Sequence, residues 1–143
     1  MKVKDVMTTN VFTSTPDSNL KDVADKMKEL NVGAIPVVQE GKPVGIITDR
    51  DIVLRTISED KNPFSAKAAD VMSVDLVLAA PEMDVDDAAA LMSRHRIRRL
   101  PVVENGKLVG IISLGDLAAK SHLADEAGKA LSDISHPIGP DLQ

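Results

Sequence analysis

Apolar residues follow two spacings along the first part of the chain. Residues 20–30 carry them every three or four positions, which predicts an amphipathic helix. That stripe consists of Leu20, Val23, Ala24, Met27 and Leu30. Residues 35–39 and 44–48 are apolar except for their last residues, Gln39 and Thr48, and they predict two buried strands. The intervening Glu40-Gly41 predicts a tight hairpin turn, because glycine accepts a positive φ. Pro16-Asp17-Ser18 predicts the turn and N-cap that precede the helix.

The same plan returns 65 residues later. Asp5-Val6-Met7 comes back as Asp70-Val71-Met72, and the register holds without a gap from Asp5 to Arg55. Other matched pairs are Ile35-Pro36-Val37-Val38 with Leu100-Pro101-Val102-Val103, Gly45-Ile46-Ile47 with Gly110-Ile111-Ile112, and Asp51 with Asp116. A repeat of this length indicates two copies of one structural unit.

Each copy is predicted to have the order βαββα. The first strands are Val11–Thr15 and Leu76–Ala80, and the last helices begin near Asp49 and Leu114. Val85, Ala88, Ala89 and Met92 form the helical stripe of the second copy, and Asn105-Gly106 forms its hairpin turn. A three-stranded sheet in so small a unit leaves one apolar face uncovered, so we expect the copies to pack together with their helices.

These elements give an α+β fold with four segments. The first repeat covers 1–60, a linker 61–67, the second repeat 68–122, and a C-terminal helix and tail 123–143. The polar stretch Ser58–Lys67 contains Pro63 and is typical of a linker. A weak helical stripe in the last segment predicts docking on the module or on a second subunit, and residues 136–143 are predicted to be frayed. The stripe consists of Leu123, Ala127, Ala130, Leu131 and Ile134.

Composition narrows the possible functions. The 143 residues include two Phe but no Tyr, Trp or Cys, so the core is predicted to be aliphatic, with Met7, Met27, Met72 and Met92 as filler. A net charge of −5 disfavours nucleic acid as a partner. No apolar run approaches the roughly 18 residues of a membrane span, and no segment has the order of a signal peptide. We therefore expect a cytoplasmic protein with no membrane partner.

Two matched motifs, Thr48-x-x-Asp51 and Ser113-x-x-Asp116, lie where a strand turns into a helix. One interpretation is a capping box, in which hydroxyl and carboxylate each bond a backbone amide. The other is a ligand site, where the helix start attracts phosphate and a carboxylate holds ribose hydroxyls. The two roles are compatible, with the hydroxyl capping the helix or turning toward a phosphate.

A basic run, Arg94-His95-Arg96-Ile97-Arg98-Arg99, also has alternative interpretations. Cations near the end of a helix offset its dipole, and a basic patch can bind nucleic acid. The net acidity, the lack of stacking aromatics and the shortness of the run disfavour nucleic acid. Arg98 and Arg99 directly precede a buried strand, and arginine can hold a phosphate with two hydrogen bonds. The first copy has Gly33-Ala34 at these positions, so the two copies differ chemically.

The doubled Gly-Ile-Ile-Thr-Asp-Arg-Asp (45–51) and Gly-Ile-Ile-Ser-Leu-Gly-Asp (110–116), with the Pro-Val-Val strands and Asp-Val-Met openings, resemble the tandem CBS-domain pair, or Bateman module. The resemblance runs from about Val3 to Ser121 and is closest to small stand-alone bacterial CBS proteins. It implies a regulatory module that binds AMP, ADP, ATP, S-adenosylmethionine or a similar ligand in clefts between the two copies. It also implies a homodimer, and an effector protein that the sequence does not name.

The resemblance also implies which residues contact the ligand. They are Thr48, Asp49, Arg50, Asp51, Arg98, Arg99, Ser113, Asp116, Thr8, Thr9, Thr13, Ile35, Pro36, Leu100 and Pro101. In related modules the opening segment of one copy completes the site of the other, which would bring Thr8 and Thr9 toward Asp116, and Ser73 and Val74 toward Asp51. Thr13 matches the family's strand threonine, whereas Leu78 replaces it in the second copy. The site with Arg99 is expected to prefer the more phosphorylated ligand.

No enzyme is expected from this sequence. No Ser-His-Asp order, phosphate loop or catalytic carboxylate pair stands out, and the scattered His95, His122 and His136 do not suggest a metal site. No cofactor is therefore required, and an adenine nucleotide or S-adenosylmethionine is the expected bound molecule. The alternative function is a structural dimerisation or interaction module that binds no ligand.

Overall fold

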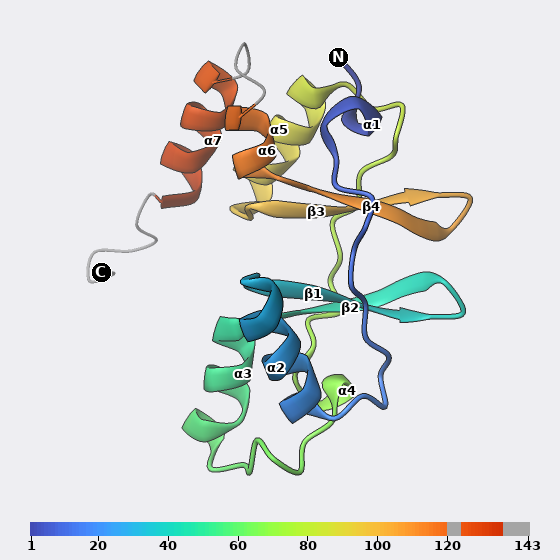
Figure 1. The fold of residues 1–143 in the computed structure, drawn as a ribbon. Helices are drawn as coiled ribbons and strands as arrows, with labels where there is room; N and C mark the ends of the chain where they lie inside the picture. Colours follow the sequence, from blue (N-terminus) through green and yellow to red (C-terminus); the bar gives the residue numbers. More distant parts are fainter. Residues whose placement is uncertain (120–123, 136–143) are drawn as a thin grey trace. The chain divides into compact units, whose positions relative to one another are not determined.

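The computed structural model describes residues 1–119 and 124–135, and within them the two copies repeat the same elements (Figure 1). The first copy contains α2 (Leu20–Leu30), β1 (Ala34–Gln39), β2 (Lys42–Thr48) and α3 (Asp49–Arg55), and the second contains α5 (Val85–His95), β3 (Arg99–Glu104), β4 (Lys107–Ser113) and α6 (Leu114–Ala119). The remaining elements are α1 (Val3–Val6), the 3-10 turn η1 (Ile57–Glu59), α4 (Ala68–Val71) and α7 (Ala124–Ser135). The α+β class and the predicted long helices are confirmed.

The hairpin turns have the backbone that their sequences predict. Glu40 and Gly41 have φ values of 54° and 81°, and Asn105 and Gly106 have 54° and 77°. Positive φ at both central residues is the mark of a type I′ turn, whose twist matches that of the flanking strands. β1 and β2 pair antiparallel, with a shift in register between Val37 and Val38.

The third strand of each predicted sheet is reduced to one bridge. Ser14 pairs in parallel with Val37, and Ala79 pairs with Val102 in the same way. The chain turns away immediately afterwards, because Pro16 has no N–H to continue a ladder. Each sheet is therefore two strands with a single added bridge rather than three full strands. The N-cap of α2 is Asn19, the residue after the predicted Pro16-Asp17-Ser18 segment, and Ser18 Oγ instead accepts from the Thr15 amide at 2.9 Å.

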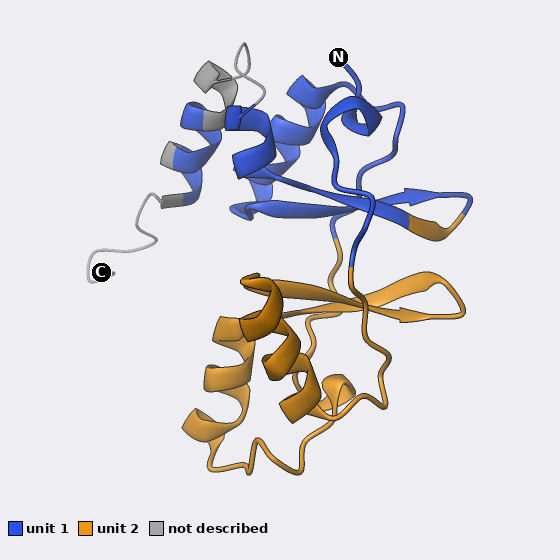
Figure 2. Ribbon diagram, in the orientation of Figure 1, with its two compact units in different colours: residues 1–11, 77–105, 109–143 blue, residues 12–76, 106–108 orange. Residues whose placement is uncertain are grey.

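The compact units of the molecule do not follow the order of the repeats (Figure 2). Unit 1 consists of residues 1–11, 77–105 and 109–143, and unit 2 of residues 12–76 and 106–108. The opening segment of the first copy therefore packs with the helices of the second. In unit 1 the Thr8 amide donates to the Ile111 carbonyl at 2.8 Å, and in unit 2 the Ser73 amide donates to the Ile46 carbonyl at 2.9 Å. Each opening segment thus lies beside the last strand of the other copy, whereas the approach of Thr8 and Thr9 to Asp116 stays a prediction.

Glycines allow these opening segments to come close to the strands. A Cβ on Gly110 would lie 2.8 Å from both the Met7 sulfur and the Thr8 carbonyl oxygen. A Cβ on Gly45 would lie 2.6 Å from the Met72 sulfur. Any side chain at either position would overlap these atoms. The Gly-Ile-Ile motif of each copy therefore contacts the Asp-Val-Met motif of the other copy.

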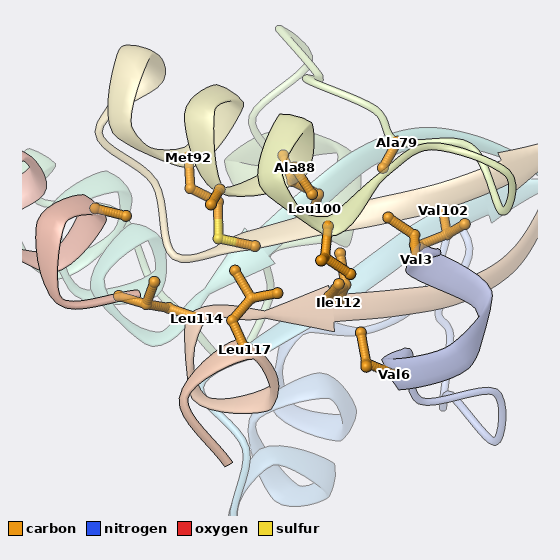
Figure 3. Packing of buried hydrophobic residues seen from close by; sticks show 13 residues of the cluster. Val3, Val6, Ala79, Ala88, Met92, Leu100, Val102, Ile112, Leu114 and Leu117 are labelled. Atoms are coloured by element: carbon orange, nitrogen blue, oxygen red, sulfur yellow. The ribbon is translucent and has the colours of Figure 1, made fainter. Parts of the chain in front are cut away.

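Each unit has its own aliphatic core, as the composition predicts. The core of unit 1 packs α1, α5 and α6 against β3 and β4, with fully buried Met92, Leu100, Ile112 and Leu117 (Figure 3). The core of unit 2 contains Leu20, Val23, Ile35 and Ile47, and the last two occupy the positions of Leu100 and Ile112. Met27 is also buried, whereas Met7 and Met72 lie half-buried at the edges of the cores.

Helix α7 belongs to unit 1 and contacts both α5 and α6. Ala130 is 1% exposed within the core, Ile134 packs against it, and Ser93 of α5 hydrogen-bonds the Asp133 carboxylate. The predicted docking on the module itself is thus observed, while Leu123 and residues 136–143 lie outside the described part of the chain. No helix within the described residues is long and apolar enough to cross a membrane.

Candidate functional site

A pocket of about 480 Å³ in unit 1 brings together several of the predicted site residues. Arg98 and Arg99 line it at the start of β3, and Ser113 lines it at the end of β4. The other lining residues are Leu114, Gly115 and Ala118 from α6, with Gly128 and Leu131 from α7. The pocket therefore combines two cations and a hydroxyl with an apolar wall.

The two guanidinium groups of this pocket have no partner among the residues that the structure describes. Neither Arg98 nor Arg99 makes an ion pair or a hydrogen bond through its side chain to any residue that the structure describes. Arg94 and His95 occupy the last turn of α5, where a cation offsets the helix dipole, but Arg98 lies beyond the helix end at Arg96 (φ 57°). The dipole interpretation thus fits Arg94 and leaves Arg98 and Arg99 available to an anion.

Both Thr/Ser-x-x-Asp motifs form capping boxes. The Asp51 amide donates to Thr48 Oγ1 at 3.1 Å, and the Asp116 amide donates to Ser113 Oγ at 3.0 Å. In return one oxygen of each carboxylate accepts from the Thr48 amide at 3.1 Å and from the Ser113 amide at 2.9 Å. The second oxygen of each carboxylate has no hydrogen-bond partner within residues 1–119 and 124–135. Capping therefore leaves one acceptor per motif available.

The equivalent place in unit 2 has the opposite charge. Gly33 replaces Arg98, and a Cβ there would lie 3.3 Å from an Asp49 carboxylate oxygen. Asp49 itself replaces the apolar Leu114, and its carboxylate accepts from the Arg50 amide at 2.8 Å. Asp49, Arg50 and Asp51 carry one net negative charge, whereas Arg98, Arg99 and Asp116 carry one net positive charge. The version with net positive charge, which has the pair Arg98 and Arg99, is the better suited of the two to an anion.

The other predicted residues occupy different environments. Thr8 and Thr9 are exposed, and Thr8 is held beside β4 by its backbone. Thr13 is half-buried in unit 2. Ile35 and Leu100 are core residues, 1% and 0% exposed.

Pro36 and Pro101 are buried, and their carbonyls accept from the amides of Ser14 and Ala79 at 3.0 and 2.9 Å. Both prolines and both core residues therefore serve the fold through these contacts. Their ligand roles stay predictions, as do those of Thr8, Thr9 and Thr13.

Sequence reasoning missed the apolar wall of the pocket. Leu131 was predicted only as part of a docking stripe, yet it is 45% exposed and lines the pocket. Gly128 and Ala118 carried no signal, because small residues near a pocket resemble those of any helix contact. No group of three acidic or histidine residues suited to a metal ion occurs among the described residues.

Comparison with known proteins decides the family. The model of the CBS domain matches the chain twice, at residues 3–57 and 68–122. The chain belongs to the CBS-domain family. The CBS domain-containing protein YhcV of Bacillus subtilis is 48% identical over 134 residues, which cover 94% of this chain and 95% of YhcV.

Solved CBS structures have the same fold. A protein with CBS domains from Burkholderia ambifaria gives a TM-score of 0.78 at 30% identity, covering 87% of this chain and 96% of that one. The CBS-domain pair of protein MJ0100, in complex with 5-methylthioadenosine and S-adenosylmethionine, gives 0.75 at 27% identity, covering 84% of this chain and 94% of that one. The chain is thus a CBS pair of the type found in regulatory proteins.

Proposed function

We propose that this CBS pair is a regulatory module that binds an adenosine-containing ligand, with the phosphate of that ligand at Arg98 and Arg99. The observation that carries the proposal is the pocket of about 480 Å³ in unit 1, where two guanidinium groups without partners in the described chain lie beside Ser113. The adenosine-type ligands of the MJ0100 pair support the same ligand class. AMP, ADP and ATP are the favoured candidates, because a phosphate offers the arginine pair more negative charge than the single carboxylate of S-adenosylmethionine.

The residues divide the recognition of such a ligand between them. Arg98 and Arg99 would hold phosphate oxygens through charge-assisted hydrogen bonds, which are stronger than neutral ones. Asp116, bonded to Ser113 by the capping box, retains one carboxylate oxygen that can accept from a ribose hydroxyl. The apolar side chains of Leu114 and Leu131 suit the face of a purine base.

Helix α7 offers a route from ligand to partner. It lines the pocket through Gly128 and Leu131, and it is held on α5 by Ala130 and by the hydrogen bond between Ser93 and Asp133. A ligand that contacts Leu131 would favour the arrangement of α7 in which the pocket is formed, and would thereby change the surface that α7 presents to an effector protein. This role needs binding alone and no catalytic step, so the module is proposed to act as a sensor and not as an enzyme.

Calorimetric titration of the full chain with AMP, ADP and ATP tests the ligand proposal. Saturable binding that is lost in the Arg98→Ala/Arg99→Ala double variant and kept in Arg50→Ala is the expected result. Arg50 is the matched control, because it is an exposed arginine beside the capping box of the other copy, and this proposal does not use the ligand contact that the family resemblance implies for it. Absence of binding by all three nucleotides at millimolar concentration would reject the proposal.

A second candidate function, self-association without a ligand, is favoured by the exposed apolar face of α3 and η1. Val53, Leu54 and Ile57 are 49%, 43% and 63% exposed, whereas α6 has Ala118 and Ala119 at the positions of the first two. Apolar side chains grouped in this way are typical of interaction surfaces. Light scattering of the wild type and of Val53→Asp tests it: a dimer that becomes a monomer in the variant supports this role, and a monomeric wild type excludes it.

A further inference from the structure

Unit 2 contains a second pocket that shares no residue with the candidate site. It has a volume of about 310 Å³ and lies between α2 and the segment that precedes this helix. Its lining consists of Phe12, Ser14, Ser18, Asp22, Val23, Asp25, Lys26 and Glu29. Ser14 and Val23 form its floor, since they are 6% and 2% exposed while the other lining residues are more accessible. The pocket is therefore a hollow with a buried base and a charged rim.

The floor contains a polar group that the fold does not use. The Ser14 hydroxyl oxygen is buried and has no hydrogen-bond partner within the described residues. Ala79 stands at the equivalent position of the second copy, 3% exposed and in the same kind of parallel bridge. The architecture is thus complete without the hydroxyl. Because burial of an unpaired hydroxyl is unfavourable, its presence beneath a pocket indicates a partner outside the described chain.

The rim is acidic and already holds an ammonium group. Lys26 Nζ lies 5.1 Å from the centroid of the Phe12 ring and 3.3 Å from a Glu29 carboxylate oxygen. Asp25 is paired with Lys21 at 2.6 Å. Asp22 makes no side-chain hydrogen bond or ion pair in the part of the chain that the structure describes. The Asp22 carboxylate therefore remains open on the rim of the pocket.

The second copy lacks this chemistry. Its positions equivalent to Phe12, Asp25 and Glu29 hold Val77, Ala90 and Arg94. The aromatic ring and two of the three carboxylates are therefore absent, and the first of these carboxylates is replaced by a small apolar group. The acidic pocket is a property of the first copy and is not required by the shared scaffold.

We propose that this pocket binds a small organic cation of the diamine class, with one ammonium group at Asp22 and the Ser14 hydroxyl. Carboxylates and an aromatic face both favour an ammonium group. A metal ion fits less well, because no three acidic or histidine side chains converge among the described residues. The volume of about 310 Å³ is at the small end of the range for ligand pockets and leaves room for a short diamine.

Titration of the full chain with putrescine at constant ionic strength tests the proposal. Asp22→Asn is expected to weaken binding about threefold or more, the scale of one accessible charge pair. The matched control is Asp87→Asn, because Asp87 is the exposed acidic residue at the same position of the second copy, and it is expected to leave the affinity unchanged. Ser14→Ala, which reproduces Ala79 and so should fold, is expected to weaken binding about twofold to fivefold.

Three results would overturn the proposal. Putrescine could fail to bind in a saturable way. Asp22→Asn and Asp87→Asn could weaken binding equally, which would indicate general attraction to a chain of net charge −5. Mg²⁺ could compete for the pocket as well as putrescine does, which would indicate a site for any cation.

Discussion

Units 1 and 2 have the same backbone contacts at the start of their last helices but different side chains there. The Leu114 amide donates to the Arg98 carbonyl at 2.8 Å, and the Asp49 amide donates to the Gly33 carbonyl at 3.0 Å. The scaffold therefore depends on the carbonyl of this residue and not on its side chain. That freedom explains how one copy can have an arginine at this position while the other has a glycine.

The helix faces of the two copies differ in the same way. In unit 1, Ala118 and Ala119 are small and α7 packs on α6, whereas α3 of unit 2 has the larger and exposed Val53 and Leu54. Small residues let a further helix approach closely, and large exposed ones leave a surface for another contact. The two copies thus share one fold but differ on this helix face. Unit 1 has a pocket walled by α7, and unit 2 has an open apolar surface.

The largest effect is expected when the difference in charge between the two units is removed at the candidate site. Arg98→Ala/Arg99→Ala is expected to weaken nucleotide binding about 100-fold, because hydrogen bonds to charged groups contribute about 1.5–3 kcal/mol each. Arg50→Ala in unit 2 is expected to change the affinity less than about twofold. Equal losses in both variants, measured by titration calorimetry, would contradict the difference between the units.

The next effect tests the contact that both units share. Gly110→Ala is expected to lower the free energy of unfolding by about 2 kcal/mol, because the new Cβ meets the Thr8 backbone oxygen, which cannot rotate away. Gly45→Ala is expected to cost about 1 kcal/mol, since it meets only the flexible Met72 side chain. Urea denaturation measures both variants, and a harmless Gly110→Ala would refute the close approach.

A smaller effect separates capping from binding. Asp51→Ala and Asp116→Ala are each expected to lower stability by about 1 kcal/mol, because the capping boxes are equivalent. Only Asp116→Ala is expected to weaken nucleotide binding as well. Thermal unfolding measured with and without ADP distinguishes the two roles. If both variants bound ADP like the wild type, capping would be the whole function of these carboxylates.

The smallest effect concerns the buried hydroxyl of unit 2. Ser14→Ala is expected to raise the free energy of unfolding by about 0.5 kcal/mol, and Ala79→Ser to lower it by a similar amount, because each change removes or adds one unpaired buried hydroxyl. Urea denaturation without added ligand measures both. A loss of stability in Ser14→Ala would show that the hydroxyl already has a partner within the protein.

Much of the scaffold could be predicted from local patterns. The helical stripes, the hairpin turns and the capping boxes depend on residues within a few positions of one another, and the internal repeat made the contrast between Arg98 and Gly33 visible. The third strand could not be predicted, because its length depends on where the chain turns after Ser14. Pro16 indicated a turn but not how early pairing ends.

The residues that line the two pockets could not all be predicted from the sequence. Leu131 reaches the pocket of Arg99 only because α7 docks on α5 and α6, a contact between segments distant in sequence. The pocket of unit 2 forms because α2 lies beside Phe12 and Ser14, and no periodicity in the sequence reveals that arrangement. Tertiary packing, rather than local propensity, decides which side chains surround an open space.

The number of phosphate-dependent sites per chain tests the central claim most directly. Titration calorimetry of the wild type with ADP, followed by the same titration of Arg98→Ala/Arg99→Ala and of Arg50→Ala, measures it. Because the two units differ in charge, we expect about one ADP site per chain. This site is expected to be lost in Arg98→Ala/Arg99→Ala and kept in Arg50→Ala. Two equivalent sites per chain, or binding that persists without Arg98 and Arg99, would contradict it.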